Sequence, residues 1–190
     1  MIASDWVTVA SWGFNLLFVS VMLLGYAAFA GLIGLLVSPF FLLSKARRRN
    51  ASLVFLISLA CLIGFTAGAV IGNQIRHRAF VELAERSRPL VNALQSYEAQ
   101  FGHPPQTLEE LVPNFIPKVP KTGLGAYPKY EYVAGDEAKR FDDNPWALYV
   151  FTPSGGINFD QFLYFPRQNY PKRGYGGWLE RIGDWAYVHE

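Results

Sequence analysis

Two long uncharged stretches dominate the first half of the chain. No Asp, Glu, Lys, Arg or His occurs in the 39 residues from Trp6 to Ser44 or in the 25 residues from Ala51 to Ile75. About 20 apolar residues are enough for a helix to cross the ~30 Å hydrocarbon layer of a bilayer. The rest of the chain is too short to bury two helices that are apolar on every face. The pattern therefore predicts two membrane spans, at about residues 14–37 and 52–73.

The first uncharged stretch is longer than one crossing requires, because such a helix would extend for about 58 Å. We interpret residues 2–13 as an interfacial segment, since Trp6 and Trp12 suit the headgroup boundary. We expect Pro39 and the basic cluster that follows it to mark the cytoplasmic end of the first span. No basic residue precedes the apolar run, so we do not expect a cleaved signal peptide.

The basic residues between the spans predict the orientation. The connecting loop, residues 45–50, contains Lys45, Arg47, Arg48 and Arg49. Positive residues that flank spans are retained on the cytoplasmic side. Arg76 and Arg78, after the second span, favour the opposite orientation but are fewer. We therefore expect the loop inside the cell and both termini outside the cytoplasm, which divides the chain into a membrane hairpin, residues 1–75, and an extracytoplasmic domain, residues 76–190.

Small residues recur at four-residue spacing on both predicted spans. They are Gly64, Gly68 and Gly72 on the second span, and Ala27, Ala30, Gly31 and Gly34 on the first. Such stripes let helix backbones approach closely in lipid. They either close the hairpin or bind a partner subunit, or they reflect only the general abundance of glycine in membrane helices.

The pattern becomes amphipathic after Ile75. Apolar residues from Phe80 to Phe101 follow a spacing of three and four. The second span is therefore predicted to continue as a long helix, with a kink or a restart at Pro89. Thr107 is then expected to cap a short helix over residues 108–112.

Beyond Pro120 the composition turns to aromatic residues, Gly and Pro, which favour strands and turns. Candidate strands are residues 129–133, 147–152, 161–165 and 185–189, with a turn at residues 153–156. Strands this close in sequence predict an antiparallel meander packed on the long helix. Alternation predicts that the helix-facing side chains are Tyr130, Tyr132, Leu148, Val150, Phe162 and Tyr164. The expected fold class is an α+β membrane protein.

The region from about Arg78 to Pro120 resembles type II secretion pseudopilins and type IV pilin-like proteins. The resemblance is carried by Ala-Leu-Gln-Ser-Tyr at 93–97, Gly-His-Pro at 102–104, Thr-Leu-Glu-Glu-Leu-Val-Pro at 107–113 and Ile-Pro-Lys-Val-Pro at 116–120. It implies a pilin-like domain, a long helix laid on an antiparallel sheet, in a protein of the bacterial inner membrane. The chain differs from true pilins in having two predicted spans instead of one.

No catalytic set emerges from the sequence. Residues 76–190 contain 13 Lys and Arg against 14 Asp and Glu, so we expect no nucleic-acid partner. The three histidines are far apart and match no metal-ligand spacing, and Cys61 lies within an apolar span. Asp142-Asp143-Asn144-Pro145 could supply oxygen ligands to a cation or simply form a turn. We expect no enzyme activity, no metal and no cofactor.

Aromatic residues are dense between Tyr127 and Tyr187. Tyr and Trp are enriched where proteins bind one another, although many here must form the core. We select Tyr175, Trp178, Trp146 and Trp185 as candidate interaction residues, with the loop 174–178 as the most exposed. The expected function is a non-enzymatic envelope protein that contacts the bilayer and other membrane or envelope proteins, as an accessory subunit of a membrane or secretion-type assembly. The alternatives are a periplasmic ligand-binding or sensory module and an envelope hydrolase.

Overall fold

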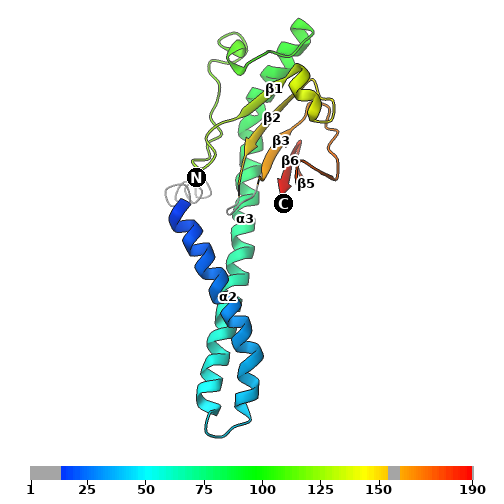
Figure 1. The fold of residues 1–190 in the computed structure, drawn as a ribbon. Coiled ribbons are helices and arrows are strands. Elements are labelled where there is room, and N and C mark those ends of the chain that lie inside the picture. The colour runs from blue at the N-terminus through cyan, green and yellow to red at the C-terminus, as the bar shows by residue number, and fades with distance from the viewer. Residues whose placement is uncertain (1–13, 154–158, 190) are drawn as a thin grey trace. The chain divides into compact units, whose positions relative to one another are not determined.

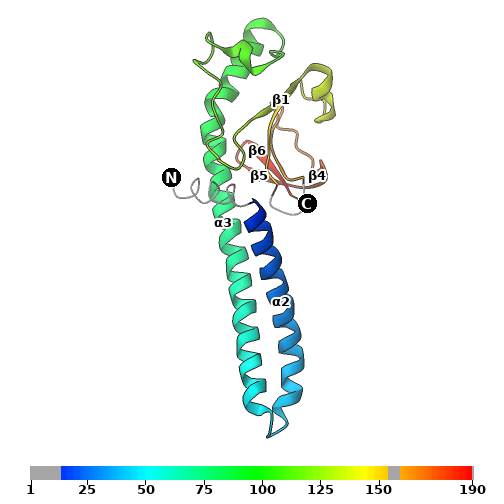
Figure 2. The same ribbon diagram turned by 60° about the vertical axis from the view of Figure 1, so that its left-hand side comes forward.

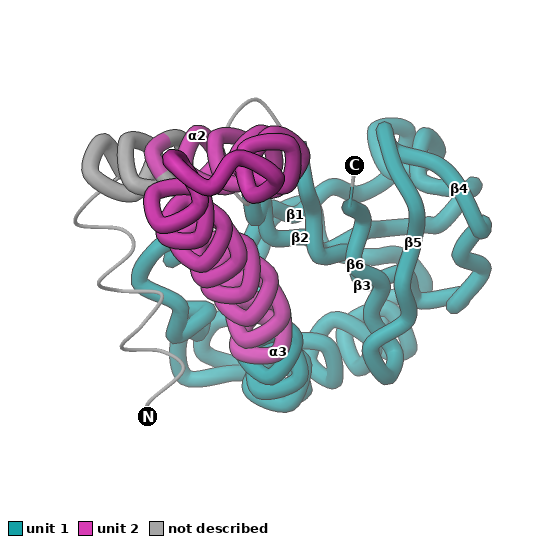
Figure 3. Tube along the Cα trace, turned by 90° about the horizontal axis from the view of Figure 1, so that it is seen from below, with its two compact units in different colours: residues 1–11, 77–190 teal, residues 12–76 magenta. Residues whose placement is uncertain are grey.

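The computed structural model describes residues 14–153 and 159–189, and the chain divides into two units. Figure 1 shows the course of the chain, and Figure 3 colours residues 12–76 and 77–190 as separate units. One helix, α3, runs from Arg48 to Phe101 and belongs to both. The predicted interfacial segment, residues 2–13, and most of the predicted turn at 153–156 fall outside the described residues.

The first unit is a pair of long helices, α2 (Phe14–Leu42) and the first part of α3. Both helices are long and apolar enough to cross a membrane by length and composition. Helix α2 continues through Pro39, which is expected near the cytoplasmic end of the first span, to Leu42. Proline is tolerated within apolar helices because neighbouring groups can satisfy the backbone carbonyl that it leaves without a donor.

The two helices of this unit approach each other where small residues face across. A Cβ added at Gly31 would lie 3.1 Å from the backbone oxygen of Ser58, and one added at Gly34 would overlap the Ser58 hydroxyl. Ser38 and Ala51 are buried on the same pair of helices. The absence of side chains at Gly31 and Gly34 therefore permits the close backbone approach that apolar helices use in lipid.

The glycine stripe of α3 is not part of this helix contact. Gly64, Gly68 and Gly72 have no described atom within 4 Å of an added Cβ, and Ala27 is exposed. These glycines therefore do not form the contact that Gly31 and Gly34 make.

The basic loop also interacts with the end of α2. The Nε of Arg48 donates a hydrogen bond of 3.2 Å to the carbonyl of Leu42, and the guanidinium of Arg47 lies 5.5 Å from the centre of the Phe41 ring. Cations near a helix C-terminus satisfy its last carbonyls and interact favourably with its dipole. Arg48 and Arg49 themselves form the first turn of α3.

The second unit is built on the C-terminal part of α3, whose apolar face recurs at helical spacing. Phe80, Leu83, Leu90 and Leu94 are at most 2% exposed. The helix continues through Pro89 without a restart, contrary to one of the two outcomes expected there. Each of these buried apolar side chains stabilises the fold by about 1.5–3 kcal/mol. Their burial together offsets the destabilisation that a proline causes inside a helix. The helix ends at Phe101, as predicted, and a 3₁₀ turn follows at Leu108–Leu111. Thr107 precedes that turn, but its side chain makes no capping hydrogen bond.

A six-stranded antiparallel sheet packs against this part of α3 (Figure 2), in the order β1-β2-β3-β6-β5-β4. The strands are β1 (Glu131–Ala134), β2 (Trp146–Phe151), β3 (Gln161–Tyr164), β4 (Arg173–Gly174), β5 (Gly177–Ile182) and β6 (Trp185–His189). β1, β2, β3 and β6 correspond to the four predicted strands within two residues and form the predicted meander. The long helix on an antiparallel sheet is thereby confirmed.

The face of the sheet toward α3 is the one that alternation predicts. Leu148, Val150, Phe162 and Tyr164 are buried in one core with the helix, and Tyr130 and Tyr132 pack against it half-buried. The Phe162 ring stacks on Phe80 at 4.8 Å and on Trp185 at 4.9 Å between ring centres. The opposite face has a smaller core, to which Phe141, Leu163, Phe165 and Val188 contribute.

Strands β4 and β5 are the part of the sheet that the sequence did not predict. The segment expected to be an exposed loop, 174–178, is instead a hairpin at the edge of the sheet. Strand β4 has only two residues, and β5 contains a glycine and two charged residues, so neither shows the alternation of apolar and polar residues by which a strand is recognised.

Candidate functional site

The β4–β5 hairpin has a tight two-residue connection. Arg173 pairs with Trp178 and Gly174 with Gly177, which leaves Tyr175 and Gly176 as the turn. Their φ angles are 56° and 94°, the left-handed region that a type I′ turn requires at both central positions. Gly176 adopts this conformation without cost, whereas Tyr175 needs support from its surroundings.

Tyr175 receives that support from the segment before β2. Its ring stacks on Phe141 with centres 5.5 Å apart, and its hydroxyl donates a short hydrogen bond to the carboxylate of Asp142. Partial burial and the neighbouring Asp142 carboxylate raise the pKa of the Tyr175 hydroxyl above its ordinary value. The turn is therefore fixed to the body of the domain by a neutral phenol.

The Asp142-Asp143-Asn144-Pro145 motif forms the turn that holds this contact. Asn144 is buried, and its amide nitrogen donates hydrogen bonds of 2.7 Å both to the Phe141 carbonyl and to the side chain of Asn169. Its amide oxygen accepts from the backbone N–H of Arg167 at 3.1 Å. The motif therefore forms the turn that the sequence analysis gave as one of its two possibilities.

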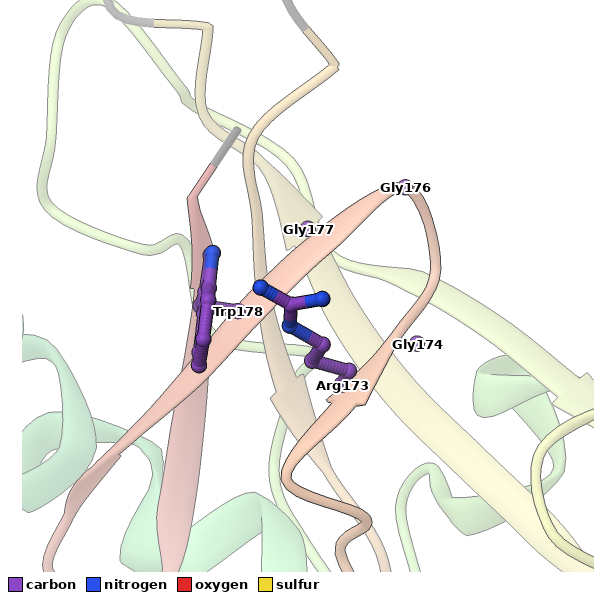
Figure 4. Close-up of a pocket in the computed structure, with 5 residues that line it drawn as sticks. All are labelled: Arg173, Gly174, Gly176, Gly177 and Trp178. Carbon is purple, nitrogen blue, oxygen red and sulfur yellow. The ribbon is translucent and has the colours of Figure 1, made fainter.

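On the other side of the hairpin, the side chains of Arg173 and Trp178 lie face to face (Figure 4). The guanidinium carbon is 3.6 Å from the centre of the indole ring. Trp178 is 53% exposed although it is one of the largest apolar side chains of the chain. The two side chains and Gly174, Gly176 and Gly177 line an open hollow of about 560 Å³. An arginine held on an aromatic face presents its N–H donors outward, in a geometry that suits phosphate or carboxylate.

Two further exposed aromatic residues lie at one end of the strands. Phe151, the last residue of β2, is 43% exposed, and Phe159, just before β3, is 56% exposed. Their ring centres are 6.4 Å apart. We call these two residues and Trp178 the aromatic edge: Phe151, Phe159 and Trp178.

The other candidate interaction residues lie in the core. Trp146 and Trp185 are 0% and 2% exposed, so burial removes both from the candidate contact surface. The Trp146 indole N–H donates a 2.9 Å hydrogen bond to Glu98 on α3, and such a buried ring packs the sheet on the helix. Of the four selected residues, Trp178 is exposed and Tyr175 is half-buried.

The three histidines contact different partners. His77 lies 3.7 Å from the Glu180 carboxylate, His103 packs beside Tyr97, and His189 stacks on Tyr187. Across residues 14–153 and 159–189, no three His, Cys, Asp or Glu side chains are grouped to hold a metal ion.

Sequence reasoning did not select Arg173. The signal was present, because a tight turn centred on Tyr175-Gly176 pairs residues 173 and 178 across the hairpin. Interpreting 174–178 as a loop concealed that pairing.

Comparisons with known proteins add no relative to this picture: no protein-family model, curated protein or solved structure matches the chain.

Proposed function

We propose that this chain is a two-span protein of a bacterial inner membrane whose C-terminal domain lies in the periplasm and acts by binding, not by catalysis. It serves as an accessory subunit of a membrane or secretion-type assembly. A relation to pilin-like proteins is part of this proposal, supported by the motifs from Arg78 to Pro120 and by the helix-on-sheet fold.

The observation that carries the proposal is the Arg173–Trp178 pair on a pre-formed hairpin. Arginine and tryptophan are the residues that most often dominate the energy of binding interfaces. Because Tyr175 and Asp142 already fix the turn, little conformational entropy is lost when the hairpin binds. A side chain as large as Trp178 gains about 1.5–3 kcal/mol on moving from water into an apolar contact.

Site-specific crosslinking tests the binding function. A photoreactive amino acid at Trp178 should crosslink to another membrane component in native membranes, whereas the same group at Val81, also exposed, should not. Mass spectrometry of the product identifies it as protein or lipid. Equal labelling at both positions, or none at Trp178, contradicts the proposal.

Proteolysis of intact spheroplasts tests the orientation separately. Added protease should digest residues 76–190 and spare the basic loop at 45–50, because the loop then faces the cytoplasm. A domain that is cut only after lysis contradicts the periplasmic location.

A ligand-binding module is the second candidate, favoured by the hollow of about 560 Å³ beside Arg173 and Trp178. Its cation and aromatic wall suit a small anionic or sugar ligand. Binding of such a ligand should change the fluorescence of the wild-type protein but not of W178F.

A further inference from the structure

The two ends of the domain can be distinguished by following α3 against the sheet. The Tyr187 ring contacts Phe80 with centres 4.9 Å apart, whereas Trp185 contacts Tyr164 at 5.3 Å. The Tyr164 hydroxyl in turn accepts a hydrogen bond from Gln95 at 3.1 Å. Moving along β6 from Trp185 to Tyr187 therefore moves back along α3, from Gln95 toward Phe80.

The register then places Trp178 at the end where α3 enters the domain. Trp178 pairs with His189, two residues beyond Tyr187 in that same direction. Two residues of strand correspond to about 7 Å. The contact of His77 with Glu180, on β5 opposite Tyr187, agrees with this placement. Figure 1 shows β6 ending at this end of the domain.

The remaining residues of the aromatic edge share this end. Phe151 pairs with Gln161 at the start of β3, which pairs with Val188 near the end of β6. Val188 in turn pairs with Leu179, the residue after Trp178. Phe151 and Trp178 therefore lie at the same end of the sheet, on strands about 14 Å apart at ~4.8 Å per strand. Their side chains leave opposite faces, because Leu179 and not Trp178 shares the face of Phe151.

The start of α3 in this domain is also where the uncharged stretch ends. Ile75 is its last residue, and His77 follows after a rise of only about 3 Å. The headgroup layer beyond the hydrocarbon is about 5–8 Å thick. Given the membrane spans of the proposed function, the chain itself holds this end of the domain at headgroup depth.

The residues at this end have the chemistry of that layer. Trp is enriched at membrane–water boundaries because its ring is apolar and its N–H is polar. Lys172, Arg173 and Arg78 are exposed and basic, and a basic residue near an anionic lipid surface contributes about 1 kcal/mol of binding. Arg173, held on the Trp178 ring, presents donors suited to a phosphate group.

We propose that the aromatic edge docks on the headgroup layer of the bilayer that α3 spans, and that Arg173 binds the phosphate of an anionic phospholipid. This inference rests on the membrane anchorage in the proposed function and names the partner of the Arg173–Trp178 site. The domain is then held against the membrane by two attachments, the helix and the hairpin.

Quenching by brominated lipid tests the docking on the full chain. In a W6F/W12F background, Trp178 is the only exposed tryptophan, since Trp146 and Trp185 are buried. The nanodiscs contain phosphatidylcholine and phosphatidylglycerol brominated near the headgroup. Introducing the W178F substitution should reduce the quenching of tryptophan fluorescence by these lipids at least twofold. Replacing phosphatidylglycerol with phosphatidylcholine, or adding R173Q, should also reduce it. The control K118Q should not, because Lys118 is exposed and lies three residues after Phe115, whose ring packs on Tyr97 and Phe101 at the far end of α3.

Alkylation of Cys61 separates the two possible failures. A membrane-impermeant thiol reagent should not modify Cys61 in the same nanodiscs, because this residue lies within the second predicted span. One outcome overturns the docking alone: Cys61 is protected, brominated lipid does not quench Trp178, and aqueous iodide does. The anchorage then stands, and the hairpin faces water and a protein partner. A reactive Cys61 overturns the anchorage and the docking together.

Discussion

The hydroxyl of Tyr187 donates a 2.6 Å hydrogen bond to the carboxylate of Asp160, and both side chains are buried. The bond connects the end of β6 to the residue that precedes β3, and the Asp160 carbonyl also accepts from the Thr152 N–H at 2.8 Å. These contacts order the strand ends on which the aromatic edge is built.

Removing that hydroxyl should destabilise the domain. A hydrogen bond to a charged group contributes about 1.5–3 kcal/mol, and Y187F leaves the buried carboxylate without this donor. We expect the free energy of unfolding in urea, measured in mild detergent, to fall by about 2 kcal/mol. Y149F is the control, because no described residue hydrogen-bonds to its hydroxyl and its ring packs on Phe141. Equal losses in the two variants would show that the bond is not what stabilises this end.

The two glycine groups of the helical unit should respond differently to the same substitution. G34L places a side chain against Ser58 and should weaken the hairpin by about 1–3 kcal/mol, because helices packed this closely have no room for it. G68L meets open space and should have little effect. SDS titration of the helical circular-dichroism signal measures both. A larger loss in G68L than in G34L would contradict the observed helix contact.

Exchanging one atom of Asn144 should expose its role as a donor. N144D keeps the oxygen that accepts from Arg167 but removes the three hydrogen bonds donated by the amide nitrogen, to the Phe141 and Asp142 carbonyls and to Asn169. It places a carboxylate near the Phe141 carbonyl, so we expect a loss of about 2–4 kcal/mol at neutral pH. The loss should shrink as the pH falls, because a protonated carboxyl can again donate. A loss that is independent of pH, measured by urea unfolding between pH 4 and about 8, would contradict this account.

Alkaline pH should destabilise the domain through its buried tyrosines. Burial raises the pKa of the Tyr130, Tyr164 and Tyr170 hydroxyls above their ordinary value of 10.0. A raised folded-state pKa means that the stabilisation is complete below pH 10.0 and is lost as the pH rises above it. We expect the thermal midpoint to be constant from about pH 7 to 9 and to fall beyond pH 10, while the tyrosinate absorbance near 295 nm rises.

The Y170F variant is the comparison for this alkaline transition. Tyr170 receives a 2.8 Å hydrogen bond from the Phe165 N–H and donates one of 2.7 Å to the Asp184 carbonyl, so the variant should be less stable at neutral pH. Its loss of stability above pH 10.0 should nevertheless be shallower than that of the wild type, because one raised pKa has been removed. An unchanged or steeper slope would assign the alkaline loss to other groups.

Sequence periodicity alone determined the long helices and most of the sheet. Uninterrupted apolar residues predict helices that can span a membrane, and the spacing from Phe80 to Phe101 predicts the helix that carries the core. Alternation predicts four strands and the face that Phe162 and Tyr164 present to the helix. These features follow from local geometry, since side chains repeat every 3.6 residues in a helix and every two in a strand.

Only the tertiary structure decided the candidate site. The same alternation could not separate the buried Trp146 and Trp185 from the exposed Trp178. Burial depends on the place of each strand in the sheet, and Trp178 lies on β5, next to the two-residue edge strand β4. Nor could it pair Arg173 with Trp178, because that contact depends on a turn held by Tyr175 and Asp142, residues distant in sequence. A contact between distant residues depends on how the strands pair, and local patterns do not encode that pairing.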